Sequence, residues 1–121
     1  LEFRRVLFRS RQFGHLLESF VVQQIRIQAG RMALKTRLWH YRDKDKLEVD
    51  CVLTQGRRTW GVEVKAAASV DSSDSKGLRR LAEQAGKDFQ GGILLYDGAS
   101  ILPLDRALNL YAVPLARLWE L

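Results

Sequence analysis

Asp50, Glu63 and Lys65 are the residues whose types and spacing could do chemistry. Aspartate and glutamate carboxylates are hard oxygen ligands for a divalent cation such as Mg²⁺, and a lysine beside them could stabilise a developing negative charge. All three lie within residues 47–66, where apolar and polar residues alternate on either side of a Gly-Arg pair. This pattern predicts a β-hairpin, and the register of that hairpin decides whether the three side chains meet.

With Gly56 and Arg57 as the central residues of a type II′ turn, or with a four-residue loop 55–58, Asp50 falls opposite Glu63. The same register places Glu48 opposite Lys65. Side chains alternate along a strand, so one face of the hairpin would be polar and the other would belong to the core. The polar face would carry Glu48, Asp50, Val52, Glu63 and Lys65, and the core face Leu47, Val49, Cys51, Leu53, Trp60, Val62 and Val64.

Like charges directly opposed in a sheet are destabilising, so Asp50 and Glu63 need a cation, a proton or a metal between them. One interpretation is a solvated face on which Glu48 and Lys65 form an ion pair and a different register keeps the two acids apart. The other interpretation is a divalent-metal site formed by Asp50 and Glu63, with Lys65 beside it to steady negative charge or to orient a water.

A third carboxylate, Glu18, lies on a predicted helix over Phe13–Gln28. Apolar residues there recur at helical spacing, and Gly30 is a plausible end. Glu18 falls at the edge of the apolar face, where a carboxylate is costly unless it is paired or coordinated. It is therefore either a metal ligand or the partner of an arginine such as Arg42.

The other elements predict one α/β domain with a mixed sheet flanked by helices. A strand over Thr36–Arg42 precedes the hairpin, and a helix over Lys76–Ala85, capped by Asp74 or Ser75, follows it. The apolar run Gly91–Tyr96 is typical of a central strand buried on both faces. Two short strands and a closing helical turn are expected over Ser100–Pro103, Asn109–Val113 and Pro114–Trp119.

The loop 43–46 leaves the register between the first strand and the hairpin open. An even-numbered loop would place Trp39 beside Asp50, and an odd-numbered loop would place His40 there. Only in the second case could His40 act as a base near the predicted site.

Basic residues of the helix over Lys76–Ala85, namely Lys76, Arg79 and Arg80, lie on or near its polar side. They are either a solvated face or a nucleic-acid-binding surface that contacts phosphates next to the metal site. The formal net charge of the chain is +6, but residues 1–11 contain four arginines and one glutamate. Without them the balance is 16 basic to 13 acidic residues, a net charge of +3, which permits nucleic-acid binding without requiring it.

Residues 1–11 read as a tail that is not native to the domain, which would then span residues 12–121. The alternative is a genuine basic arm that contacts phosphate. Cys51, the single cysteine, predicts a small core residue in a reducing cytoplasm. No apolar run reaches the roughly 18 residues of a membrane span, so a membrane partner is not expected.

Asp50, a 12-residue gap and then Glu63-Val64-Lys65 resemble the signature of PD-(D/E)XK nucleases. Further motifs, in the same order, resemble a PD-(D/E)XK nuclease-like domain of unknown function that lies C-terminal to AAA-type ATPase domains in bacteria and archaea. The resemblance covers roughly residues 13–119. Its motifs are Gly14-His15-Leu16-Leu17-Glu18-Ser19-Phe20-Val21-Val22, Trp39-His40-Tyr41-Arg42-Asp43-Lys44, Glu48-Val49-Asp50, Val62-Glu63-Val64-Lys65 and Ala112-Val113-Pro114-Leu115.

The resemblance implies a restriction-endonuclease-like α/β core and a metal-dependent nuclease that acts on DNA. Asp50, Glu63 and Lys65 would be catalytic, and Glu18, Asp50 and Glu63 would hold Mg²⁺ or Mn²⁺. It also implies an attached AAA-type ATPase domain as a partner. The alternative is a catalytically silent module that binds DNA or protein for that ATPase. Glu48 would either pair with Lys65, as in such a silent site, or extend the site.

Overall fold

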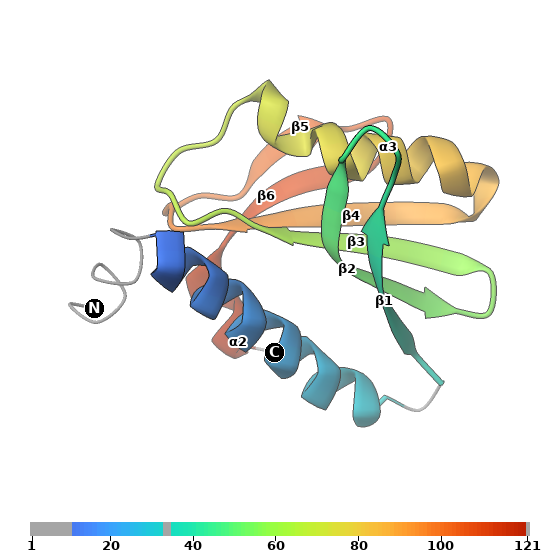
Figure 1. The fold of residues 1–121 in the computed structure, drawn as a ribbon, viewed down its shortest axis with the longest axis horizontal. Helices are drawn as coiled ribbons and strands as arrows, with labels where there is room; N and C mark the ends of the chain where they lie inside the picture. Colours follow the sequence, from blue (N-terminus) through green and yellow to red (C-terminus); the bar gives the residue numbers. More distant parts are fainter. Residues whose placement is uncertain (1–10, 33–34, 121) are drawn as a thin grey trace.

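A computed structural model of the chain describes residues 11–32 and 35–120. In this part of the chain a six-stranded mixed sheet is covered by one helix on each face, so the protein is α/β (Figure 1). The proposed non-native tail lies outside the described residues except for Arg11, which begins the first helix.

The elements follow the predicted order. They are α2 (Arg11–Gly30), β1 (Arg37–Arg42), β2 (Glu48–Gln55), β3 (Arg58–Val64), η1 (Ser72–Ser75), α3 (Lys76–Ala85), η2 (Gly86–Asp88), β4 (Phe89–Tyr96), β5 (Leu102–Asp105), β6 (Leu110–Pro114) and η3 (Leu115–Glu120). The bounds predicted for α3 are confirmed at both ends.

The strand order across the sheet is β1-β2-β3-β4-β6-β5. The first three strands are antiparallel, β4 runs parallel to both β3 and β6, and β5 is antiparallel to β6. β4 is therefore a central strand, as its apolar sequence predicts. A parallel connection needs a crossover, which α3 supplies between β3 and β4.

The hairpin register is confirmed from the turn as far as Cys51 and Val62, but the predicted pairing of Asp50 with Glu63 is not formed, because the two strands separate there. Gln55 pairs with Arg58 and Cys51 with Val62, with Gly56 in the turn at a φ of 60°. A positive φ is a conformation that glycine adopts at little cost, and this explains the position of the turn.

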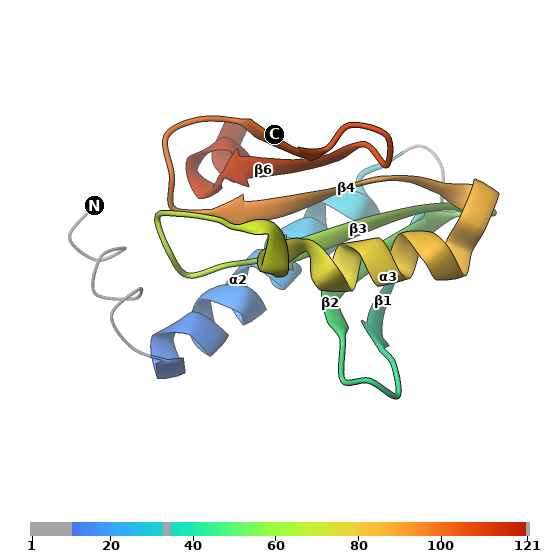
Figure 2. The same ribbon diagram turned by 90° about the horizontal axis from the view of Figure 1, so that it is seen from above.

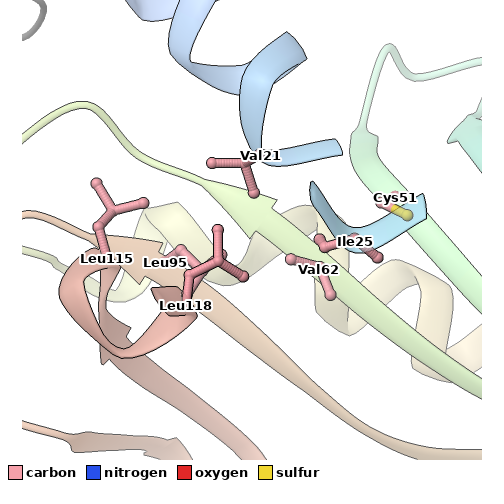
Figure 3. Packing of buried hydrophobic residues seen from close by; sticks show 7 residues of the cluster. All are labelled: Val21, Ile25, Cys51, Val62, Leu95, Leu115 and Leu118. Atoms are coloured by element: carbon pink, nitrogen blue, oxygen red, sulfur yellow. The ribbon is translucent and has the colours of Figure 1, made fainter. Parts of the chain in front are cut away.

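One core lies between α2, η3 and the sheet. Its buried residues are Val21, Ile25, Cys51, Val62, Leu95, Leu115 and Leu118, which Figure 3 shows converging from the helix and the strands. Leu53 and Val64 pack against this cluster, so the prediction that they share a face with Cys51 and Val62 is confirmed.

The opposite face of the hairpin is also core, which corrects the prediction that it is polar. In the view from above, α3 lies in front of the sheet and α2 behind it (Figure 2). Leu78 and Leu81 of α3 pack with Val52, and a Cβ on Gly61 would come within 2.6 Å of Leu78 and 2.9 Å of Leu81. Gly61 thus lets the helix approach the sheet, and the acidic residues are left only at the strand ends.

A β-bulge in β2 changes which residues share a face. Trp39 pairs with Val52 but Tyr41 pairs with Val49, so β2 contains one residue more than β1 between these pairs. The extra residue reverses the alternation. Val49 consequently packs with Val52 on the α3 side, and its predicted place beside Cys51 is wrong.

The start of α3 also differs from its prediction. Neither Asp74 nor Ser75 caps α3 with its side chain; the Ser75 hydroxyl donates to the Ser72 carbonyl oxygen at 3.0 Å. The cap lies one turn earlier, where Asp71 and Asp74 form a reciprocal capping box around η1.

Candidate active site

Asp50 lies where β2 and β3 separate. The paired positions of the two strands end at Cys51–Val62, one residue short of Asp50. The backbone N–H of Val64 instead donates to Oδ2 of Asp50 at 2.8 Å. The carboxylate thus replaces a strand-to-strand hydrogen bond, and its position is set by the backbone of β3.

Glu63 lies on the α3 side of the same fork, beside the first turn of that helix. A Cβ on Gly77 would lie 3.0 Å from Oε1 of Glu63 and would clash with the Glu48 carbonyl oxygen. Gly77 is buried. The absence of a side chain there allows α3 to close over the end of the hairpin next to Glu63.

The carboxyl groups of this region repel one another and are partly buried, so their pKa values are raised. Burial, and then the Glu18 carboxyl, raise the pKa of Asp50 to about 7 against the lowering effect of the Val64 N–H. Burial, followed by Asp50, Glu18, Asp74 and Glu48, raises the pKa of Glu63 to about 8. Glu18 raises the pKa of both Asp50 and Glu63, so the three carboxyl groups lie near one another, and this carboxyl cluster favours a proton or a cation.

Lys65 has a partner other than the predicted one. Its Nζ lies 2.6 Å from Oδ2 of Asp74, whereas Glu48 pairs with Arg42 at 3.4 Å between Oε1 and Nε. The expected Glu48–Lys65 pair is therefore wrong. β2 and β3 do not continue as a ladder to these positions, and η1 brings a different acid to the lysine.

Asp74 is the residue that sequence reasoning missed, because it was interpreted as a loop or capping residue. The spacing Asp71-x-x-Asp74 is a signal for a capping box, but only the fold shows that the box faces Lys65.

His40 lies across from the bulge formed at Asp50 and Cys51. The loop between β1 and β2 spans Asp43–Leu47, which is an odd number of residues. Its two ends are joined by a hydrogen bond from the Leu47 N–H to Oδ1 of Asp43 at 3.0 Å. His40 is exposed, and its charge is among those that lower the pKa of Asp50. The structure therefore contains the odd-numbered loop of the two alternatives, and His40 lies across from Asp50 as that alternative predicts.

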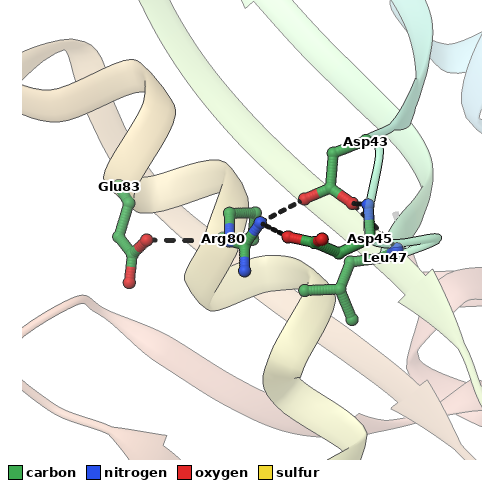
Figure 4. A network of polar contacts seen from close by, with 5 residues as sticks. All are labelled: Asp43, Asp45, Leu47, Arg80 and Glu83. Atoms are coloured by element: carbon green, nitrogen blue, oxygen red, sulfur yellow. Dashed lines mark hydrogen bonds and ion pairs between the residues drawn. The ribbon is translucent and has the colours of Figure 1, made fainter.

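Two of the three predicted nucleic-acid-binding residues are engaged by acidic side chains. Nη1 of Arg80 lies 2.6 Å from Asp43 and 2.9 Å from Asp45, and its Nε lies 3.7 Å from Glu83 (Figure 4). These contacts tie α3 to the turn between β1 and β2.

Arg79 is bound on the other side of the helix. Its Nη1 lies 2.5 Å from Asp105, its Nε donates to the Ser75 hydroxyl, and its Nη2 donates to the Leu104 carbonyl oxygen. Lys76 is exposed at the start of α3. Both arginines have structural roles, and their contact with phosphate stays a prediction.

Carboxylate oxygens suit Mg²⁺ and Mn²⁺, and Mg²⁺ commonly takes only one or two protein carboxylates with water and phosphate oxygens. Among residues 11–32 and 35–120, no group of three or more His, Cys, Asp or Glu side chains is arranged to hold a metal ion. A cation held by Asp50 and Glu63 with water or substrate oxygens stays a prediction.

No helix in the described part of the chain has both the length and the apolar character that crossing a bilayer requires. No significant match to the chain was found among curated proteins or among solved structures. A family model, described as Domain of unknown function (DUF4143), matches residues 13–118 and so includes every residue of the carboxyl cluster, Lys65 and Asp74. The chain belongs to this DUF4143 family.

Proposed function

We propose that the domain is a metal-dependent phosphodiesterase that acts on DNA. The observation that carries the proposal is the meeting of three carboxyl groups, from α2, β2 and β3, at the fork of the hairpin, where burial and mutual repulsion raise the pKa values of Asp50 and Glu63. Such strongly perturbed acids cluster at functional sites more often than elsewhere.

The order of the elements supports the same proposal. A helix, three antiparallel strands, a crossover helix and a parallel strand form the part of the chain from α2 to β4. This is the arrangement expected of a restriction-endonuclease-like core, in which the aspartate and the Glu-x-Lys motif occupy adjacent strands. β6 and β5 extend the sheet beyond it.

In this proposal Asp50 and Glu63 would hold Mg²⁺ or Mn²⁺, with Glu18 as a third ligand. When bound, the ion would polarise the scissile phosphate and lower the pKa of a bound water. The chain contributes the ligand geometry, because the Val64 N–H fixes Asp50, and it contributes the Lys65 ammonium, which stabilises charge that develops on the phosphate.

The test combines Mn²⁺ titration by calorimetry with nicking of supercoiled plasmid and branched DNA in Mg²⁺ or Mn²⁺. Asp50→Asn is the sharpest variant, since an amide oxygen can still accept the Val64 N–H while the charge is lost. We expect wild-type cleavage to depend on metal, and Asp50→Asn and Lys65→Ala each to reduce the rate about 100-fold.

Asp88→Asn, which removes a carboxylate at the far end of α3, is the matched control. Cleavage that survives both Asp50→Asn and Lys65→Ala would exclude this site.

A second candidate is a catalytically silent module that binds DNA or protein for an attached AAA-type ATPase domain. The observation that favours it is the ion pair of Lys65 with Asp74. In this candidate the ion pair would hold the ammonium away from a substrate, which is the opposite of a positioning role in catalysis. The same titration separates the candidates. A silent module would give no metal-binding heat that depends on Asp50, while labelled DNA would still bind and its affinity would fall on Lys76→Ala.

A further inference from the structure

Asp74 holds Lys65 through a single, well-anchored oxygen. Oδ2 of Asp74 accepts from Nζ of Lys65 at 2.6 Å and from the backbone N–H of Asp71 at 2.8 Å. Both members of the ion pair are largely covered, with 27% of the Lys65 side chain and 20% of the Asp74 side chain exposed. The lysine is therefore bound by a carboxylate that is itself fixed to the backbone of Asp71.

The segment that carries Asp74 is anchored on both sides. Asp71 Oδ1 accepts from the Ser73 N–H at 2.9 Å, which closes the capping box from the other direction. The next residue, Ser75, is fully buried and accepts from Arg79 Nε at 2.9 Å. Arg79 in turn binds Asp105 and the Leu104 carbonyl oxygen, so η1 is tied through α3 to β5.

The other end of the ion pair is equally constrained. The Lys65 N–H donates to the Leu95 carbonyl oxygen at 2.8 Å, which continues the pairing of β3 with β4 by one residue. Lys65 follows Glu63 by two residues in an extended chain, so the two side chains leave the strand on the same side. Asp74 also contributes to the raised pKa of Glu63, which places its charge within reach of the carboxyl cluster.

From this geometry we infer that Asp74 is a positioning residue for Lys65: it fixes the ammonium on the side of β3 that carries Glu63, without itself contacting substrate. The inference rests on the proposed phosphodiesterase function. It assigns a task to the loop 66–75, which otherwise only connects β3 to α3. Residues that do not touch the substrate commonly hold a reacting side chain in its working orientation in this way.

Two variants separate the charge of Asp74 from its capping role. Asp74→Asn keeps an oxygen that can accept the Asp71 N–H but removes the negative charge, and Asp74→Glu keeps the charge on a longer side chain. Asp88→Asn again serves as the control for the loss of a carboxylate. Thermal unfolding of each variant shows whether the fold is intact.

The first readout is the lysine ammonium signal in ¹H–¹⁵N NMR spectra, which does not depend on catalysis. The Lys65 signal is assigned by its disappearance in Lys65→Arg. We expect a slowly exchanging Lys65 ammonium in the wild type and in Asp74→Glu, and rapid exchange in Asp74→Asn. An unchanged Lys65 signal in Asp74→Asn would overturn the inference, because Asp74 would then not be holding the lysine.

The second readout is the kinetics of metal-dependent DNA cleavage. We expect kcat to fall about 10-fold to 100-fold in Asp74→Asn with KM and the Mn²⁺ affinity unchanged, and Asp74→Glu to recover part of the loss. A changed NMR signal with an unchanged kcat would overturn the positioning role. Absence of cleavage in the wild type would instead reject the proposed phosphodiesterase function and the catalytic part of this inference with it, while the NMR result would still decide whether Asp74 holds Lys65.

Discussion

At the scale of single residues, the carboxyl groups of Asp50 and Glu63 retain their protons at higher pH than carboxyls in water. Burial disfavours their ionised forms, and Glu18 and the two acids themselves add repulsion. A carboxyl group whose pKa is higher in the folded than in the unfolded protein binds its proton more tightly when folded. The metal-free fold is therefore expected to be most stable at mildly acidic pH.

This leads to a prediction on pH dependence. Without divalent cations, the free energy of unfolding should fall by about 2 kcal/mol between about pH 6 and about pH 8, as the folded-state carboxyls lose protons that the unfolded chain has already lost. Urea unfolding in the presence of a chelator measures this slope.

Glu63→Gln should reduce the slope, because the amide has no proton to lose, while Asp50 still loses its proton in this range. Asp88→Asn should leave it unchanged. A wild-type stability that does not decline over this interval would show that the cluster is solvated in solution and does not hold its protons.

At the scale of elements, the position of α3 depends on two glycines that allow close approach. Gly61 in β3 lies under Leu78 and Leu81, and Gly77 in the helix lies against the Glu48 carbonyl oxygen. Gly61 sets the distance from α3 to the sheet. Gly77 sets how far the first turn of α3 reaches over the carboxyl groups of Asp50 and Glu63. The contacts at Gly61 are with leucine side chains, whereas the contact at Gly77 is with backbone.

We predict that Gly77→Ala destabilises the protein by about 1–3 kcal/mol, the usual cost of forcing extra volume into a packed site. The clash is with backbone, so it cannot be relieved by a side-chain rotation. Gly30→Ala is the matched control, since a Cβ at Gly30 would meet nothing within 4 Å. Urea unfolding compares the two, and equal stabilities would mean that α3 shifts freely.

The elements and the hairpin register could be predicted because they depend on local rules. Alternation identifies the strands, Gly56 identifies the turn, and together they determine that Cys51 pairs with Val62. The bulge at Asp50 and Cys51 could not be predicted, because it depends on how β1 pairs with β2. Its consequence, the transfer of Val49 to the α3 side, was therefore missed.

The candidate site, too, has a part that local sequence patterns predict and a part that depends on contacts between distant residues. Asp50, Glu63 and Glu18 could be chosen from spacing, helix position and the family resemblance, and their charges influence one another in the structure, while their role as metal ligands stays a prediction. The partner of Lys65 could not, because Asp74 reaches it from a loop that has no periodic pattern. Its location follows from the anchoring of η1 by Arg79, a contact between residues far apart in sequence.

At the scale of the whole molecule, two cores share the same central strands. Val62 and Leu95 face α2, whereas Leu94 of the same strand β4 faces α3 with Leu78 and Leu110. Neither layer can lose its packing without exposing strands on which the other depends. We therefore expect the domain to unfold as one cooperative unit.

Leu78→Ala tests this expectation. Leu78 is fully buried, so the substitution should lower the free energy of unfolding by about 2–5 kcal/mol. Tryptophan fluorescence and far-ultraviolet circular dichroism should shift to the same new midpoint. Separate midpoints would indicate that the α3 layer unfolds before the α2 layer.

The hydrogen bond from the Val64 N–H to Asp50 also has an evolutionary consequence. An asparagine at position 50 could accept the same bond, so a descendant of this protein could lose its charge there and keep its fold. Under the proposed function, such a change would remove the metal site without a visible change of fold. Among members of the family, aspartate or asparagine at this position would then separate domains that can bind the metal from domains that share only the fold.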